Sequence, residues 1–320
     1  MGVTVLAGGV GAARFLRGLM EVVAHDEITA VVNTGDDTEL NGLAISPDLD
    51  TITYTLAGAT DPDRGWGLAG ETWRTMGALE RYVPVRPAGS VAAPTWFNLG
   101  DQDLATHLYR TARLREGATL TETTAEIARA WGLDLQLLPM TDDRFRTMVT
   151  VHNGMDEAGE EISFQDYFVR LRHGVPIRSL RFDHDDAMPT AGVLAALGAG
   201  TVIVAPSNPL VSIGPIRALP GVDAQLSTRR DTVVAVSPIV GGAALKGPAD
   251  RMLAELGLEA TVVGVARAYA SIAGTLVVDP ADADLADAVE AVGMRCVVTP
   301  SVMSVPGVAA SLARACLDAV

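Results

Sequence analysis

Carboxylates gather in three short segments near the N-terminus, and they are the side chains best suited to chemistry. The segments read NTGDD (33–37), SPDLDT (46–51) and DPDRGWG (61–67). Carboxylate oxygens suit Mg²⁺, which typically takes one or two carboxylates together with substrate phosphate. The alternative is structural, because aspartate is common in turns and helix caps, and Asp50 could simply cap a helix over 51–56. Taken together, the three segments predict a metal site.

Asp50 has a second possible role as a general base. A hydroxyl that attacks phosphorus loses its proton, and a carboxylate within hydrogen-bond reach can accept that proton. Metal ligand and base are competing roles for one side chain, and the sequence leaves both open.

A glycine-rich turn, LAGGVGAAR (6–14), links an apolar run to a helical pattern. Glycines let the backbone approach a ligand closely, and the N-terminus of a helix offers free N–H groups to phosphate. No Gly-Lys-Ser/Thr follows, and the segment is not a clean G-x-G-x-x-G. The turn therefore predicts a phosphate-bearing ligand other than NAD, with a purely structural tight turn as the alternative.

A second polar loop, APSNPLVSIGP (205–215), follows another apolar strand. Ser207, Asn208 and Ser212 can donate hydrogen bonds, and Gly214 permits close approach, although the same residue types also build Asx and ST turns. SPIVGG (237–242) repeats this placement with weaker chemistry. Two interpretations of Lys246, which follows this segment, stay open: it contacts an anion, or it is a solvated surface side chain.

Short apolar, β-branched runs alternate with helical patterns in both halves of the chain. Continuous apolar strands separated by helices are typical of a parallel sheet covered on both faces. We therefore predict an α/β fold with a Rossmann-like, doubly wound, mostly parallel sheet. Strands are expected at 3–7, 29–33, 201–205, 232–236, 261–265, 275–278 and 295–298.

The middle of the chain has a different pattern. Residues 101–132 predict two helices, the second announced by Thr119-x-x-Glu122, a capping box. Residues 147–185 mix short strands with charge. We predict a nucleotide-binding core of residues 1–60 and 190–320, and a smaller mixed or helical insertion lobe of residues 61–189.

Composition excludes several classes of protein. The 320 residues are 48% hydrophobic with a formal net charge of −15 and no basic run, so nucleic acid is not an expected partner. No apolar run reaches the roughly 20 residues of a membrane span, and the N-terminus lacks a basic signal region. Cys296 and Cys316 form neither a zinc pattern nor a disulfide framework. We expect a cytoplasmic protein without membrane contacts.

Nine segments, in order from residue 2 to near 305, resemble the 2-phospho-L-lactate transferase family of coenzyme F-420 biosynthesis, and more closely its actinobacterial phosphoenolpyruvate transferase branch. They read LAGGVGAARFLRGL, VVNTGDD, SPDLDT, DPDRGWG, ETW, LGDQDLATH, LLPMTDD, APSNPLVSIGPI and VAVSPIVGG.

The resemblance implies a Mg²⁺-dependent transferase. The acceptor would be Fo, a deazaflavin whose side chain ends in a hydroxyl, and the insertion lobe would help to form its site. The donor would be a guanosine diphosphate ester of enolpyruvate or lactate, and GMP would leave. The family fold is Rossmann-like with a smaller lobe, and a homodimer is expected.

The resemblance also assigns roles to residues. Asp50 becomes the catalytic residue and, with Asp36, a metal ligand. Where family members commonly have Arg after LGD, this chain has Gln102, which puts a cationic Fo contact in doubt unless Arg64 or Arg110 replaces it. Trp96 and Trp66 lie near the deazaflavin or pack in the core. The predicted substrate contacts are Gly8, Gly9, Gly11, Thr34, Asp48, Arg64, Trp66, Ser207, Asn208, Pro209, Ser212 and Gly214.

An alternative is the gluconeogenesis-factor family, whose members resemble this core but bind nucleotide sugars as non-enzymatic regulators. They carry DDGGSSG after the second strand, where this chain reads DDTELNG (36–42). The sequence leaves open which three-carbon acid the donor carries. It predicts that Asp50→Asn abolishes transfer and leaves the fold intact.

Overall fold

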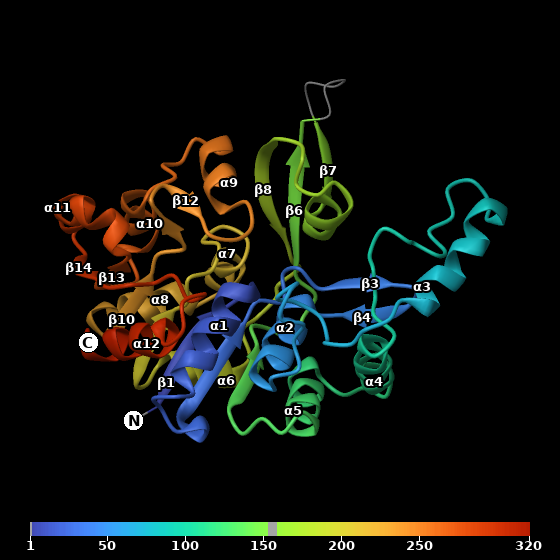
Figure 1. Ribbon diagram of the computed structural model, residues 1–320, viewed down its shortest axis with the longest axis horizontal. Coiled ribbons are helices and arrows are strands. Elements are labelled where there is room, and N and C mark those ends of the chain that lie inside the picture. Colours follow the sequence, from blue (N-terminus) through green and yellow to red (C-terminus); the bar gives the residue numbers. More distant parts are fainter. Residues whose placement is uncertain (1, 153–158) are drawn as a thin grey trace.

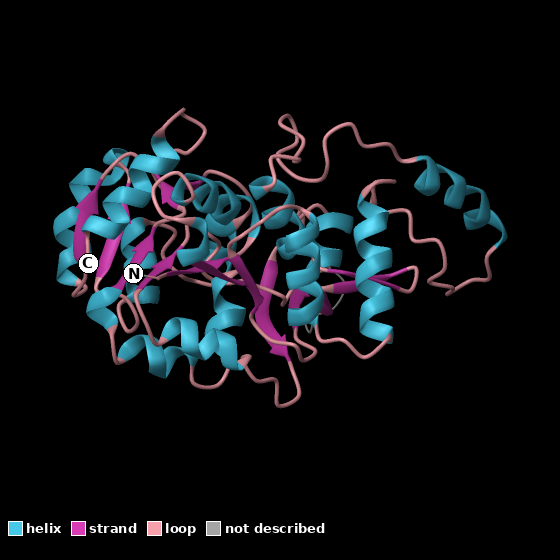
Figure 2. Cartoon of the chain, turned by 90° about the horizontal axis from the view of Figure 1, so that it is seen from below, coloured by secondary structure: helices cyan, strands magenta, loops and turns pink. Residues whose placement is uncertain are grey.

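The computed structural model describes residues 2–152 and 159–320. A seven-stranded, entirely parallel sheet runs through the molecule with helices on both faces (Figures 1 and 2). This confirms the predicted α/β, doubly wound architecture. In spatial order the strands are β14 (Arg295–Val298), β13 (Thr275–Val278), β10 (Val233–Val236), β9 (Thr201–Val204), β1 (Val3–Ala7), β2 (Ile28–Val32) and β5 (Gln136–Pro139).

The strand order reverses at β1, which pairs with β2 on one side and β9 on the other. The chain first builds outward through β2 to β5, then returns to β9 and continues to β14. In such sheets the loops beyond the carboxyl ends of the strands diverge at the reversal and leave a crevice for ligands. The glycine turn after β1 and the polar loop after β9 therefore flank this point.

Side chains of the strands alternate between two buried apolar clusters, because successive residues of a strand face opposite sides. One cluster includes Val5 and Ile203 and is covered by α1 (Gly9–Leu19), α2 (Pro47–Leu56), α5 (Leu120–Ala130) and α12 (Val308–Asp318). The other includes Leu6 and Val202 and is covered by α6 (Ala191–Leu197), α7 (Ile213–Ala218), α8 (Val222–Ser227), α9 (Ala249–Glu255), α10 (Val262–Tyr269) and α11 (Ala286–Ala291).

All predicted strands but one are confirmed to within one residue. The strand expected over 261–265 is wrong, because this segment begins α10. The Thr261 hydroxyl accepts the N–H of Gly264 as an N-cap, and Val262, Val265 and Tyr269 are buried at helical spacing. The β-branched residues suggested a strand, but the cap and the 3.6-residue period decide for a helix.

Most of the remaining elements project from the core, whereas α5 packs on the sheet (Figure 1). The two helices predicted in 101–132 are confirmed as α4 (Asp103–Arg115) and α5, and Thr119 and Glu122 form both bonds of the capping box. A hairpin of β3 (Thr38–Leu40) and β4 (Leu43–Ile45) leads to α2, and α3 (Arg74–Leu79) lies far out on the same side of the molecule. A separate antiparallel sheet has the order β7 (Glu160–Ser163), β6 (Arg146–Val151) and β8 (Ile177–Asp183).

Smaller elements complete the chain. A short hairpin joins β11 (Ile239–Val240) and β12 (Ala243–Ala244), a π-helical turn covers Asp166–Arg170, and 3₁₀ turns cover His25–Glu27, Glu80–Val85, Arg230–Thr232 and Pro280–Leu285. The predicted domain division stays a prediction, although β5, which falls within 61–189, is the edge strand of the main sheet. Among the described residues, no helix has the length and apolar character to cross a membrane.

Candidate active site

The glycine turn and the polar loop after β9 are in direct contact. Gly9 has a φ of +71°, and α1 begins there. A Cβ on Gly11 would lie 2.5 Å from the carbonyl oxygen of Pro206, so no side chain fits at that position. The hydroxyl of Ser207 donates to the carbonyl of Gly8 at 2.9 Å. The structure therefore brings together the two segments that were predicted to hold the nucleotide, and that role stays a prediction.

The polar loop is shaped largely by its own side chains. The side-chain oxygen of Asn208 accepts the N–H groups of Leu210 (2.9 Å) and Val211 (3.4 Å), an Asx turn. Its amide nitrogen lies 3.7 Å from the sulfur of Met252. Pro209 is buried, and a Cβ on Gly214 would lie 3.2 Å from the ring of Phe182. The side-chain oxygen of Asn208 therefore serves to shape the loop, as the turn interpretation predicted. Its amide N–H groups are the part of this side chain that can bind a ligand.

Asp48 lies on the N-terminus of α1. One of its oxygens accepts the N–H of Gly9 at 3.0 Å, and the other accepts the side-chain amide of Asn33 at 2.9 Å. A Cβ on Gly8 would lie 2.9 Å from Asp48 Oδ2 and 2.7 Å from Cβ of Ser212. A carboxylate therefore already occupies part of the anion-binding end of this helix.

Asn33 ties the carboxylates together. Its amide nitrogen also contacts Asp36 Oδ2 at 3.3 Å and the carbonyl of Val211 at 3.3 Å, and its oxygen accepts the N–H of Gly35 at 2.9 Å. Burial, followed by the charge of Asp48, holds the pKa of Asp36 well above its ordinary value. Burial likewise raises the pKa of Asp48 to about 6. Negative charge is crowded here, and only the neutral amide of Asn33 bridges the two carboxyls.

Asp37 continues the cluster toward α2. The hydroxyl of Ser46 donates to Asp37 Oδ2 at 2.6 Å, and burial raises the pKa of Asp37 well above its ordinary value. Three polar atoms are buried here without a hydrogen-bond partner: one carboxylate oxygen of Asp36, one of Asp37 and the hydroxyl of Thr34. Such groups are costly to bury unpaired, so they are natural contacts for a ligand or an ion.

Asp50 lies in a polar layer between α2 and α4, close enough to Asp37 for its charge to contribute to the raised pKa of that residue. Arg110 engages both of its oxygens, with Nη1 at 3.1 Å and Nη2 on the other oxygen. Asp103, His107 and Arg110 share one face of α4, and His107 lies between the two carboxylates, 3.7 Å from Asp50 and 3.1 Å from Asp103. The hydroxyl of Tyr54 donates to Asp103 at 2.6 Å. Asp50 is inside α2, which begins at Pro47 after Ser46, so the N-cap interpretation of Asp50 is wrong.

Two sets of side chains offer ligands to a metal. Ligand atoms of Asp50, Asp103 and His107 all lie within 4.8 Å of one another, but Arg110 would have to yield its place on Asp50. The second set is Asp36 with Asp48, where a buried carboxylate oxygen lacks any partner. Crowded carboxylates with an unpaired oxygen fit a hard divalent cation. Within the described residues, no set of three close ligand atoms combines Asp36 with Asp50.

Arg64 and Trp66 lie on the loop after α2. Arg64 pairs with Asp61 at 3.1 Å, donates to the carbonyl of Leu68, and packs over the rings of Trp66 and Trp73 at 5.5 and 5.0 Å. Trp66 remains 49% exposed. Arg64 is therefore already neutralised, while Trp66 keeps a surface open to a ligand.

The ETW and LGDQD segments bind each other. Glu71 accepts the backbone N–H groups of Gln102 (2.8 Å) and Asp103 (3.1 Å), and Gln102 turns its amide to the carbonyl of Gly70 (3.2 Å). Asp101 accepts the N–H groups of Arg74 and Thr75 at the start of α3. Trp96 packs edge-on against Phe97 in the small core of the lobe. These contacts account structurally for much of both segments.

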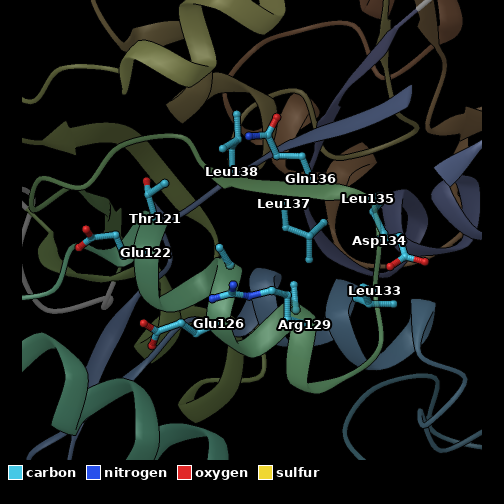
Figure 3. Close-up of a pocket in the computed structure, with 12 residues that line it drawn as sticks. Thr121, Glu122, Glu126, Arg129, Leu133, Asp134, Leu135, Gln136, Leu137 and Leu138 are labelled. Atoms are coloured by element: carbon cyan, nitrogen blue, oxygen red, sulfur yellow. The ribbon is translucent and has the colours of Figure 1, made fainter. Parts of the chain in front are cut away.

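Two cavities differ in whether residues of the candidate site line them. One of about 220 Å³ is lined by Thr34, Asp37 and Ser46 together with the segment 142–146. Another of about 590 Å³ lies between α5 and β5, where Leu137 points toward the helix and Arg129 lies along it (Figure 3). None of the predicted site residues lines the larger cavity, so the smaller one is the space next to the candidate site.

The sequence argument left the role of Arg110 open and did not single out Asp103 or His107 as site residues. Their spacing of four and three residues on a helix that begins after LGD was the available signal, because it puts all three on one face. The sequence did not indicate that these side chains pair with Asp50, because Asp50 lies sixty residues before Arg110 in the chain.

Comparisons with known proteins cover nearly the whole chain. A family profile described as 2-phospho-L-lactate transferase CofD matches residues 3–303. Proteins named phosphoenolpyruvate transferase from Streptomyces griseus, Kitasatospora aureofaciens and Mycobacterium tuberculosis are 42%, 43% and 40% identical, each over 99% of this chain and 97–98% of their own length. Two crystal structures of one Bacillus halodurans protein, described as a UPF0052 family member, superpose with TM-scores of 0.62 and 0.59 at 16% and 15% identity, covering 99% of this chain and 98–99% of their own, which supports the fold alone.

Proposed function

Because the chain belongs to the 2-phospho-L-lactate transferase CofD family and is a transferase, we propose that it moves a phosphoenolpyruvyl or 2-phospholactyl group from a guanosine diphosphate donor to the hydroxyl of the deazaflavin Fo. GMP is the leaving group, and the product is an intermediate of coenzyme F-420. The observation that carries this proposal is the identity of 40% or more with phosphoenolpyruvate transferases over the whole chain. It also favours the transferase over a nucleotide-sugar-binding regulator.

The arrangement around α1 supports a bound nucleotide. Free N–H groups at its N-terminus, the glycine turn and the loop 206–214 meet at the reversal of strand order. We assign donor contacts to Gly8, Gly9 and Gly11 and to the loop from Ser207 to Gly214. The acceptor is proposed to approach through the cavity beside Thr34 and Asp37, with Trp66 open to it from the loop after α2.

A bound metal fits this proposal because the donor phosphate and the carboxylate of Asp48 would both lie at the N-terminus of α1, where their negative charges would repel each other. Asp48 already accepts the N–H of Gly9, so a phosphate at this helix end meets a carboxylate. Mg²⁺, when bound by Asp36 and Asp48, would neutralise both and polarise the phosphate. Asp50 acts as the base or a ligand only after Arg110 releases one of its oxygens. We further propose a cytoplasmic homodimer, as the family resemblance implies.

The test is a transfer assay. The purified protein is incubated with Fo, Mg²⁺ and the enolpyruvyl or lactyl guanosine diphosphate, and products are read by mass spectrometry. We expect a deazaflavin that has gained the phospho-acid group, one GMP per product, and loss of both with EDTA. Asp36→Asn should lose transfer, whereas the exposed Asp63→Asn should not. Absence of product with every donor, together with tight binding of a nucleotide sugar, would favour the regulator instead.

A further inference from the structure

Lys246 is the single lysine of a chain that has 24 basic residues. It lies in the exposed segment between β12 and α9, beyond the carboxyl end of β10. Arg14 is half-buried on α1, in the helix that follows the glycine turn. These two side chains come from distant parts of the sequence, and the segments that carry them follow β1 and β10, which are separated in the sheet by β9.

Both cations converge on the loop after α2. A Cβ on Gly65 would lie 3.0 Å from the Lys246 ammonium and 3.4 Å from a terminal nitrogen of Arg14. Gly65 has a φ of +73°, a conformation that disfavours any side chain there. The absence of a side chain at this position therefore leaves room for the two cations to meet.

Neither cation has a compensating charge. Throughout residues 2–152 and 159–320, no carboxylate forms an ion pair with Arg14 or Lys246, although the chain has 39 acidic residues. The nearby Arg64 is by contrast paired with Asp61. Burial and then the charge of Arg14 lower the pKa of Lys246. Two unpaired like charges repel each other, and an anion between them would remove that cost.

A solvated surface lysine is the alternative, and its exposure alone would favour that interpretation. Arg113, Arg181 and Arg217 each bind a carboxylate, whereas other arginines, such as Arg17, form no ion pair among the described residues. What distinguishes the pair at Gly65 is that two unpaired cations from different elements converge on one backbone position.

We propose that Arg14 and Lys246, with the turn at Gly65, form the binding site for an oxyanion of the donor, either its diphosphate or the carboxylate of its three-carbon acid. The inference rests on the proposed function and deepens it. The donor fits because it is the substrate with anionic groups, whereas the acceptor attacks through a hydroxyl. Mg²⁺ at Asp36 and Asp48 would do little more than offset the charge of those two carboxylates, so the negative charge of the donor calls for a further cationic contact.

Calorimetric binding of GDP, GMP and guanosine tests the site without any chemistry. Loss of one charge-assisted contact should weaken GDP binding by about tenfold or more in Lys246→Met and in Arg14→Met. Guanosine should bind these variants as it binds the parent protein. The control is Arg17→Met, which removes an exposed cation from the same helix and should leave GDP binding within about twofold.

The two anion sources are separated by a parallel titration with the enolpyruvyl and lactyl donors, carried out without Fo so that no transfer can occur. Equal losses for GDP and for the donors identify the diphosphate. Losses confined to the acid-bearing donors identify the carboxylate. Unchanged binding of every ligand in both cation variants overturns the proposal.

A direct readout uses the unique lysine. Reductive ¹³C-methylation labels Lys246 and the terminal amine alone, and the pKa of the labelled side chain is followed by NMR. GDP or an acid-bearing donor should raise this pKa, and an unchanged titration in the presence of all of them would contradict the site. If the parent protein transfers its group but the variants bind normally, the anion site fails and the transferase stands. If the parent protein shows no transfer but the variants still bind GDP more weakly, the anion site stands and the transferase proposal fails.

Discussion

Replacing Asp50 by Asn should destabilise the protein substantially, contrary to the expectation from sequence that the fold would stay intact. The guanidinium of Arg110 is only 1% exposed and uses Asp50 as its one anionic hydrogen-bond partner among the described residues. Its other hydrogen bonds go to His107 at 3.3 Å and to the carbonyl of Ala44 at 3.4 Å. Asp37 and Asp103 also act on Arg110 through their charge, but neither forms a hydrogen bond with it among the described residues, so they replace only part of the lost attraction.

The magnitude follows from burial. Two unit charges about 4 Å apart interact by roughly 4 kcal/mol at an effective dielectric constant near 20. Removing one partner of a buried pair typically costs about 3 to 5 kcal/mol, because the other charge stays desolvated. A domain is stable by only about 5 to 15 kcal/mol, so Asp50→Asn should lose a large part of its stability.

Urea unfolding followed by tryptophan fluorescence measures this loss. The control is Arg113→Met on the same helix. The side chain of Arg113 is 30% exposed and that of its partner Glu126 is 23% exposed, so solvent screens the pair and this variant should cost far less stability than Asp50→Asn. The double variant Asp50→Leu/Arg110→Met, which removes both charges, should recover most of the loss. A cost below about 1 kcal/mol for Asp50→Asn would refute the reasoning. Loss of transfer in this variant is informative about chemistry only where it remains folded.

Three further predictions follow from the candidate site. The pKa of Asp48 is raised from 3.8 to about 6, so the folded protein binds more protons than the unfolded chain between these pH values. Stability should therefore fall by roughly 3 kcal/mol as pH rises through this window, and Asp48→Asn should flatten that slope in unfolding curves. Gly8→Ala would bring a methyl group within 2.7 Å of Ser212, so GDP binding should fall about tenfold or more in calorimetry. Asp101→Ala removes the acceptor for the first N–H groups of α3 and should loosen this helix locally, seen as faster hydrogen exchange over Arg74–Leu79 with unchanged exchange in the core.

The parts of the fold that were predictable are those with local signals. Val3–Ala7 and Thr275–Val278 are continuous apolar runs with β-branched residues, and both are strands with the predicted bounds. Gln136–Pro139 was missed because its four residues carry no β-branched side chain, and its place as a strand comes from pairing with β2. The segment 261–265 shows the reverse error, where strand-like residues are overruled by a cap and a helical period.

The candidate site divides in the same way. That the glycine turn and the loop after β9 would meet was readable, because loops at the carboxyl ends of neighbouring parallel strands share one edge. That Asp50 pairs with Arg110 was not, since Arg110 lies on a helix that packs against α2 only in three dimensions. The identity of a side chain is local information, but its partner is decided by tertiary packing.

The mutual binding of the ETW and LGDQD segments closes the base of the outlying segment 74–98. Glu71 and Asp101 hold its two ends together, so the core has no need of a particular number of residues between them. Once a loop is pinned at its base, doubling its length costs only about 0.6 kcal/mol in closure entropy. This part of the chain can therefore lengthen, shorten or change composition during evolution with little effect on the folding of the sheet, and it is the natural place for an engineer to insert or delete sequence.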